Sequence, residues 1–227
     1  MGKFIKLIYL TCAFLIMGTF ILGILTKKSF KENTLDLNSK EYYSANVSLQ
    51  EDEESSFKYF NNNIKNLDEL VNNSDLIVIG SVDKERLLYN SAIKTKFIIS
   101  DVIRNNSEVT NLPNKIFIFE PSYFNFDTYF IKDGYNIMQN NAEYIVFLKH
   151  LEKPTGYEYK NDEMITFIPV STYYGKFELK NVETTKVISS SQTLTYQDIK
   201  SQSIVTENQK IIDTYNNIKS ELGVYLK

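Results

Sequence analysis

The stretch Ser74-Asp75-Leu76-Ile77-Val78-Ile79-Gly80-Ser81-Val82 decides the fold of this chain. Its four consecutive aliphatic residues, three of them β-branched, favour a buried strand. Gly80 follows the aliphatic run directly. A glycine can bend or bulge a strand where side chains would crowd. We therefore predict that residues 74–82 form the first, bent strand of a sheet.

Short apolar segments after this stretch predict the rest of the sheet. A polar, hairpin-like stretch is expected at residues 83–91, and residues 93–100 then alternate apolar and polar side chains until the phase breaks at Asp101, which predicts a bulge. Further strands are predicted at residues 116–119, 143–148, 164–170 and 173–179, with Pro169 suited to an edge. No helical segment separates the first three strands, so antiparallel pairing is favoured. The sequence predicts a mainly β fold with flanking helices (α+β), built as a small antiparallel barrel or curled sheet.

Two amphipathic helices are predicted to flank this sheet. The first leads into the opening strand, can be capped by Ser55 or Ser56, and has its apolar residues three or four apart at Phe57, Phe60, Ile64, Leu67 and Val71. The second follows a capping box at residues 195–198 and is expected to stop at Gly223, with apolar positions at Ile204, Ile211, Tyr215, Ile218 and Leu222. Both are expected to dock on the sheet, and a coiled-coil-like partner contact is the alternative for the second.

The order of these segments resembles that of a type of uncharacterised bacterial surface protein. The resemblance covers residues 57–180 and rests on the leading helix, the opening stretch, Lys96-Phe97-Ile98-Ile99-Ser100-Asp101-Val102-Ile103 and Glu143-Tyr144-Ile145-Val146-Phe147-Leu148. The pattern is also similar to the oligonucleotide/oligosaccharide-binding (OB) type of barrel in netrin and tissue-inhibitor modules. The resemblance implies an OB-like barrel. The cysteines of the animal modules are absent from the body, so the metal-chelating N-terminus of the tissue inhibitors is not implied.

The N-terminal segment predicts a membrane anchor. The nineteen residues from Leu7 to Leu25 carry no charge and are flanked by lysines. A helix of this length just spans a hydrocarbon core of about 30 Å. No small-x-small cleavage site is present, so an uncleaved transmembrane signal anchor is favoured over a cleaved signal peptide. The predicted organisation is an anchor (1–28), a polar stalk (29–56), a barrel domain with its leading helix (57–180) and a C-terminal loop and helix (181–227), with the body outside the cytoplasm.

Charge and composition exclude several classes of function. The formal net charge is −3, and the four lysines of the first 28 residues leave −7 on the body, which argues against nucleic acid as a partner. The single cysteine, Cys12, lies in the apolar N-terminal run, so the body has no disulfide and no thiol-based site. His150 is the only histidine and is expected in a turn at the end of its strand. No metal and no cofactor are predicted.

A cluster of aromatic residues between the third and fourth strands is the strongest candidate for a binding surface. Its members are Tyr123, Phe124, Phe126, Tyr129, Phe130 and Tyr135. If exposed, these rings could stack on sugars or anchor a protein partner. If buried, they would plug one end of the barrel, which we favour because most large aromatic residues are buried.

Three functions remain open at this stage. We favour a non-enzymatic, membrane-anchored module that binds a protein or a glycan at the cell envelope. A hydrolase could instead recruit a pair of the acids near strand ends, which are Asp75, Asp101, Glu120, Asp127, Asp133 and Glu143. An assembly protein could use its C-terminal helix to pair with a membrane partner.

Overall fold

The computed structural model of the chain describes residues 2–29, 34–37, 39–51, 58–89, 91–180 and 193–226. They divide into two compact units, Met1–Thr34 and Leu35–Lys227. The first unit contains helix α1 (Gly2–Ser29). Among the described residues, no helix combines the length and the apolar character that crossing a membrane requires. The spanning helix predicted from Leu7 to Leu25 is thus not supported by the structure.

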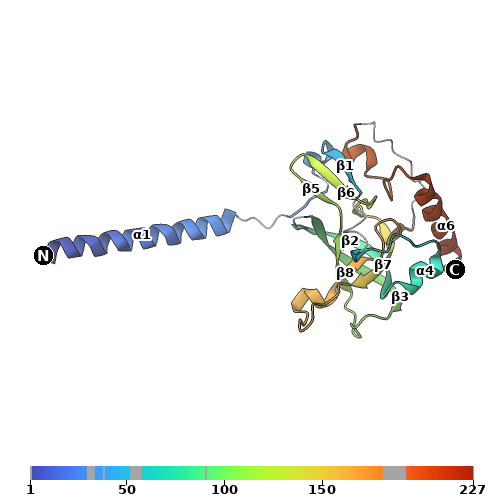
Figure 1. Cartoon of the computed structure of the whole chain (residues 1–227), viewed down its shortest axis with the longest axis horizontal. Helices are drawn as coiled ribbons and strands as arrows, with labels where there is room; N and C mark the ends of the chain where they lie inside the picture. The colour runs from blue at the N-terminus through green and yellow to red at the C-terminus, as the bar shows by residue number, and fades with distance from the viewer. Residues whose placement is uncertain are drawn as a thin grey trace. The chain divides into compact units, whose positions relative to one another are not determined.

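The second unit is built on a closed five-stranded barrel (Figure 1). Its strands are β2 (Leu76–Tyr89), β3 (Ala92–Asn105), β4 (Lys115–Glu120), β7 (Glu143–His150) and β8 (Thr166–Pro169). They lie in the order β2-β3-β4-β8-β7, and β7 pairs back with β2 to close the ring. Strand β9 (Lys176–Glu178) pairs antiparallel with the first half of β7, and a short 3-10 helix, η1 (Asn161–Ile165), precedes β8. The prediction of a mainly β, barrel-like fold is confirmed.

One pair of strands departs from the predicted antiparallel arrangement. Strand β8 runs parallel to β4. The two strands are not consecutive, since β5, β6 and β7 lie between them in the chain, so no hairpin forces them to be antiparallel. Strand β8 lies within the barrel wall, between β4 and β7, and not at an edge. Pro169 is the last residue of β8. The prediction of an edge position for Pro169 is therefore wrong.

The opening strand has both faces covered, which explains its unbroken aliphatic run. Leu76 and Val78 are fully buried inside the barrel, whereas Ile77 and Ile79 belong to the core that packs against the helices outside it. A Cβ at Gly80 would lie 2.1 Å from the carbonyl oxygen of Ile98, and the register with β3 shifts between Ile79 and Gly80. The glycine therefore permits the close strand approach at the bend, as predicted.

The strand continues seven residues further than predicted. The polar stretch taken for a hairpin at residues 83–91 belongs mostly to β2, and the turn to β3 follows Tyr89. A register shift between Val82 and Arg86 takes up the polar residues without ending the strand. The bulge predicted near Asp101 is confirmed by two further register shifts in the pairing of β2 with β3.

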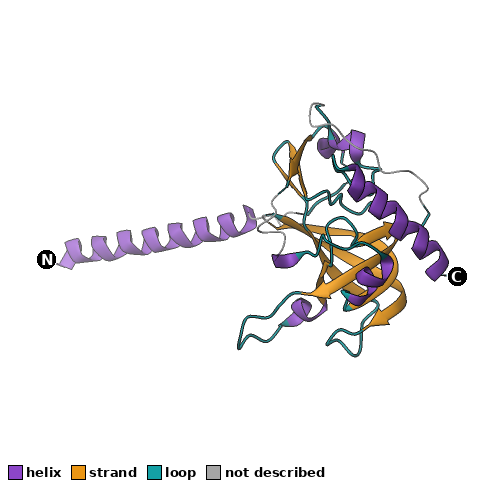
Figure 2. Cartoon of the chain, turned by 45° about the vertical axis from the view of Figure 1, so that its right-hand side comes forward, coloured by secondary structure: helices purple, strands orange, loops and turns teal. Residues whose placement is uncertain are grey.

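Two helices cover the outer face of β2 and β7. Helix α4 (Leu67–Asn72) and helix α6 (Gln209–Tyr225) pack there, and Figure 2 shows α6 lying across the strands. The buried residues of α6 are Ile212, Tyr215, Ile218 and Leu222. Docking of this helix is confirmed, but Gly223 does not stop it and Ile204 precedes it. Asn208 caps its start by accepting a hydrogen bond from the amide of Lys210.

The leading helix is much shorter than predicted. Only α4 and a single turn at residues 58–59 are helical, while Phe57 and the proposed caps Ser55 and Ser56 lie outside the described residues. Asn61 and Asn62 interrupt the helical pattern because they form hydrogen bonds with the residues that follow β8. The amide N–H of Asn61 donates to the carbonyl of Val170, and the Asn62 side chain accepts from Ser171 and Thr172. Asparagine side chains compete with helical hydrogen bonds in this way.

A second, three-stranded sheet lies beside the barrel (Figure 1). Its order is β1 (Asn46–Gln50), β6 (Thr128–Lys132) and β5 (Tyr123–Asn125). The inner face of this sheet packs on helix α2 (Lys40–Tyr43) and helix α5 (Tyr196–Ile199). The capping box predicted at the start of α5 is confirmed, since Thr195 donates from its amide and its hydroxyl to Asp198.

This second sheet uses residues that were expected in the stalk. Leu35, Leu37 and Ala45 are buried in the core beneath it, and β1 pairs in parallel with β6 along its whole length. The scattered apolar residues of a polar segment therefore reach a core that is formed by distant parts of the chain. Stalk residues 30–33, 38 and 52–56 lie outside the described residues.

Candidate functional site

The inner wall of the barrel is polar at the end of β4. The side chains of Arg86 and Glu120 are 1 % and 0 % exposed and form an ion pair of 3.1 Å between Nη1 and Oε1. Arg86 and Thr95 are cross-strand partners on β2 and β3, and the Thr95 hydroxyl donates to the same carboxylate oxygen. The other oxygen of Glu120 accepts from the Tyr135 hydroxyl at 3.1 Å and from the Met138 amide at 2.7 Å.

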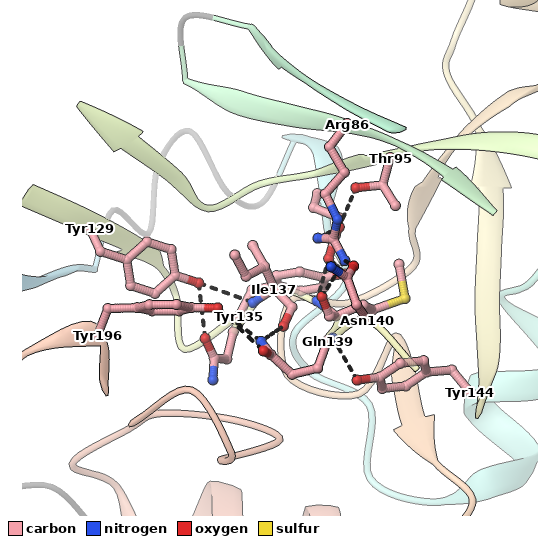
Figure 3. A network of polar contacts seen from close by, with 12 residues as sticks. Arg86, Thr95, Tyr129, Tyr135, Ile137, Gln139, Asn140, Tyr144 and Tyr196 are labelled. Carbon is pink, nitrogen blue, oxygen red and sulfur yellow. Dashed lines mark hydrogen bonds and ion pairs between the residues drawn. The ribbon is translucent and has the colours of Figure 1, made fainter. Parts of the chain in front are cut away.

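The segment that follows β6 supplies further members of this polar network (Figure 3). Arg86 also donates to the carbonyl of Met138, and Gln139 donates from its amide to the Tyr144 hydroxyl at 2.8 Å. Burial, followed by the nearby negative charge of Glu120, raises the pKa of Tyr135 well above its usual value. Tyr135 therefore stays a neutral hydrogen-bond donor to the carboxylate over the physiological pH range.

Lys176 lies near the same network. Its side chain is 4 % exposed, donates to the carbonyl of Ser203 at 3.0 Å, and lies 5.0 Å from the Tyr135 ring centroid. Burial lowers the pKa of Lys176 to about 8, although the negative charges of Glu120 and Glu178 oppose the effect. The hydrogen bond from Lys176 to Ser203 connects β9, which is paired with the barrel, to the segment between α5 and α6.

This polar cluster is suited to holding the fold and not to catalysis. Each oxygen of Glu120 already accepts two hydrogen bonds, and the carboxylate has no exposed surface from which to reach a substrate. A general acid or base must come within hydrogen-bond distance of the reacting group. Of the acids named for a hydrolase, Glu120 is thus committed to Arg86 and its neighbours.

An open, mainly apolar groove lies on the outside of the barrel, where it contacts β3, β4 and β8. It has a volume of about 470 Å³, and its aromatic walls are Tyr59, Phe60, Phe119 and Tyr123. Ser91 lines it from the β2–β3 turn and Ala92 from the start of β3. Pro121 follows the end of β4, Leu151 lies in the β7–β8 connection, and Ile168 is in β8. Polar groups are few, chiefly the side chains of Gln50 and Lys132. A cleft with apolar walls and a few placed polar groups is the usual form of a ligand site.

The groove residues are held by two unrelated parts of the fold. Residue 119 points outward on β4 because its neighbours Ile118 and Glu120 point inward, and the Phe119 ring meets Tyr89 edge-on at 5.4 Å. Tyr123 and Lys132 come from the three-stranded sheet. The Tyr123 ring stacks on Phe130 at 5.0 Å with 18° between the planes. The groove therefore lies between the barrel wall and the second sheet.

The predicted aromatic cluster forms a β-hairpin, β5–β6, in place of the expected loop, and strand alternation divides its members. Phe124 and Tyr129 are buried in the core under the second sheet, where they stack at 4.6 Å. Tyr123 and Phe130 form a pair on the other face, and only Tyr123 lines the groove. Phe126 is 96 % exposed at the hairpin tip. The hairpin thus contributes both buried and exposed aromatic rings.

A smaller polar cavity of about 450 Å³ adjoins the groove and shares Tyr59, Leu151 and Ile168 with it. His150 lines it as the last residue of β7, and its Nε2 lies 3.0 Å from the carbonyl oxygen of Met164. The amide of His150 donates to Asp75 at 3.1 Å. His150 ends its strand as predicted, and its ring is used in local contacts.

Most groove residues were missed by sequence reasoning, although one signal was present. Residues 116–119 are apolar without alternation, which means that both faces of β4 are apolar and that Phe117 and Phe119 need cover or a ligand on the outside. No pattern connects Gln50 or Tyr59 with β4, because they are joined only through the fold.

Within the described part of the chain, no group of three or more His, Cys, Asp or Glu side chains is arranged to hold a metal ion. A scan against protein-family models, a search of curated proteins and a search of solved structures gave no match for this chain.

Proposed function

We propose that this chain is a membrane-anchored, extracytoplasmic binding module of the cell envelope and that the groove holds its ligand. The observation that carries the proposal is the position of the groove. Its barrel side is lined by Ala92 at the start of β3, Phe119 of β4 and Ile168 of β8, and the β2–β3 turn and the β7–β8 connection border it. The ligand class is an apolar, aromatic-containing protein segment.

The strand order supports an OB-like assignment, in keeping with the resemblance to netrin and tissue-inhibitor modules. The first strand of this barrel pairs with both the second and the fourth, and the third runs parallel to the fifth, and these pairings support the proposal. OB barrels bind ligands on the face of their second and third strands, between the loops that join strands one and two and strands four and five. Ser91 of the β2–β3 turn, Phe119 of β4 and Leu151 of the β7–β8 connection line the groove, and their positions in the barrel support this part of the proposal.

The lining favours a protein segment over a glycan. Sugar rings present many hydroxyl groups, and each one that loses water needs a partner. Besides the hydroxyl groups of its two tyrosines, the groove offers the side chains of Gln50, Lys132 and Ser91 as polar groups, against four aromatic rings. Aromatic residues dominate the central contacts of protein interfaces.

The anchor in this proposal rests on the sequence. The uncharged residues from Leu7 to Leu25, with lysines on both sides, have the length and flanks of a signal anchor. The full chain is expected to remain in the membrane pellet after alkaline carbonate extraction and to be digested by protease added outside intact cells. Release into the supernatant would contradict the anchor and leave the groove untouched.

The groove itself can be tested with a small probe. The full chain in lipid nanodiscs is titrated with N-acetyl-phenylalanine amide and, in parallel, with chitotriose, and binding is followed by saturation-transfer NMR against empty nanodiscs. Tyr59→Ala should weaken binding of the phenylalanine probe at least fivefold. Tyr225→Ala is the matched control, because Tyr225 lies on α6 with 48 % exposure, close to the 45 % of Tyr59. Equal binding by both variants, or binding of chitotriose alone, would contradict the proposed ligand class.

A further inference from the structure

Phe126, at the tip of the β5–β6 hairpin, is unusual in two independent ways. Its side chain is 96 % exposed, and its backbone has a φ of 51°. The other described non-glycine residues with positive φ are Asp133, Asn141 and Asn161. Asparagine and aspartate tolerate this region, whereas a bulky side chain there is an outlier. The fold thus gains no burial from Phe126 and holds it in a strained turn.

Strained residues that contribute nothing to packing point to an interaction. Asn125 and Thr128 pair across the hairpin and hold the two-residue turn that presents Phe126 and Asp127 to solvent. The tip therefore offers one aromatic ring beside one carboxylate. A suitable receptor needs an apolar cavity with a cationic group at its border.

The groove of this same chain has that chemistry. Its walls are aromatic and its volume of about 470 Å³ admits a phenyl ring, while Lys132 lines it and Lys58 lines the adjoining cavity. We propose that the groove of one copy receives Phe126 of a second copy, with Asp127 facing Lys132. This inference rests on the proposed function, because it names the partner of the same groove.

A copy cannot fill its own groove with its own tip. Tyr123 and Lys132 line the groove at one end of the hairpin, and Phe126 lies at the other end. Lys132 lies four positions along the strand from Thr128, which is about 13 Å at about 3.3 Å per position. The contact is therefore between copies, with the tip of one on the groove of the next. Such head-to-tail contacts use different surfaces on the two partners and extend into rows or close into rings.

The inference can be tested by cysteine crosslinking of the full chain in membranes. Two differently tagged copies carry Cys12→Ser, and one also carries Asn125→Cys beside the tip while the other carries Ser91→Cys in the groove. Both Asn125 and Ser91 are exposed. A short bismaleimide should give a mixed dimer. Pairing Ser91→Cys with Val224→Cys, which is 75 % exposed on α6, sets the background.

Adding Phe126→Ala to the Asn125→Cys copy should lower the mixed dimer at least tenfold. Folding should be unaffected because the side chain is almost fully exposed. Lys132→Glu in the Ser91→Cys copy should lower it as well, and Asp127→Lys in the other copy should then restore it. A mixed dimer that does not exceed the Val224 background, or that survives Phe126→Ala, would overturn the inference. If the same protein still binds N-acetyl-phenylalanine amide, the proposed function stands without it, whereas loss of both would overturn both.

Discussion

At the end of β4 the inner face of the strand is polar and the outer face is apolar. This is the reverse of the usual arrangement in a barrel. Inside, Glu120 is fully buried and holds Arg86, Thr95 and Tyr135. Outside, Phe119 and the following Pro121 line an open groove. Strands in soluble proteins commonly direct apolar side chains into the core and polar side chains to solvent. Both oxygens of the buried Glu120 accept hydrogen bonds, so the inner face stabilises the fold, while the outer face carries the groove that we propose as a binding site.

The largest expected effect is at the buried carboxylate. Glu120→Ala leaves Arg86 as an unpaired buried charge, and breaking a buried pair in this way costs about 3–5 kcal/mol. The free energy of unfolding, measured by urea titration with circular dichroism, should fall by that amount. Glu152→Ala is the control, because Glu152 is exposed at the adjoining cavity, and it should change the free energy by less than about 0.5 kcal/mol.

The double variant Arg86→Met with Glu120→Met should be less destabilised than Glu120→Ala. Replacing both members of a buried ion pair by apolar groups avoids the uncompensated charge. If the single and double variants lose equal stability, the inner face is held by packing and not by its polar bonds.

The sequence predicted the apolar framework of the fold better than it predicted either face of β4. The opening strand, its bend at Gly80 and the docking of α6 follow from runs and periods that are local in the chain. The polar inner face does not, because Arg86 lies in a segment that looks like a hairpin and Glu120 looks like a surface acid. Arg86 and Glu120 can pair only because β2 continues through residues 83–89. This continuation follows from the closed barrel and not from the local sequence. The groove depends likewise on β1, which appears polar in sequence and becomes ordered against distant β6.

A smaller effect is expected at Tyr135. Tyr135→Phe removes the hydroxyl that donates to Glu120, and one buried acceptor loses part of its hydrogen bonding. The expected loss in free energy of unfolding is about 1–3 kcal/mol. Tyr123→Phe makes the same chemical change on the groove side and should cost less than about 0.5 kcal/mol. Equal losses for the two variants would mean that the faces do not differ as described.

The pH dependence of stability should reflect Lys176. Because burial lowers its pKa to about 8 in the folded state, the unfolded state binds more protons between pH 8 and the ordinary lysine value of 10.5. Stability therefore rises with pH over this window. Between pH 7 and pH 9 the gain is about 1 kcal/mol, which is read as the difference between the wild type and Lys176→Met, since that variant lacks the titrating group. If the difference in free energy of unfolding between the two proteins does not change with pH, burial does not lower the pKa of Lys176 in the folded state.

The smallest effect on stability is expected in the groove. Tyr59 is 45 % exposed and lines the groove without any described hydrogen bond from its hydroxyl group. Tyr59→Ala should therefore change the free energy of unfolding by less than about 0.5 kcal/mol, as Tyr225→Ala should, even though both remove a large aromatic ring. Urea titration of the two variants beside Glu120→Ala places both faces on one scale. A loss above about 2 kcal/mol for Tyr59→Ala alone would make the ring part of the core, and weaker binding by that variant would then report damage to the fold. A small loss in stability together with weaker binding separates the two faces, because a residue that the fold can spare would be needed by the ligand.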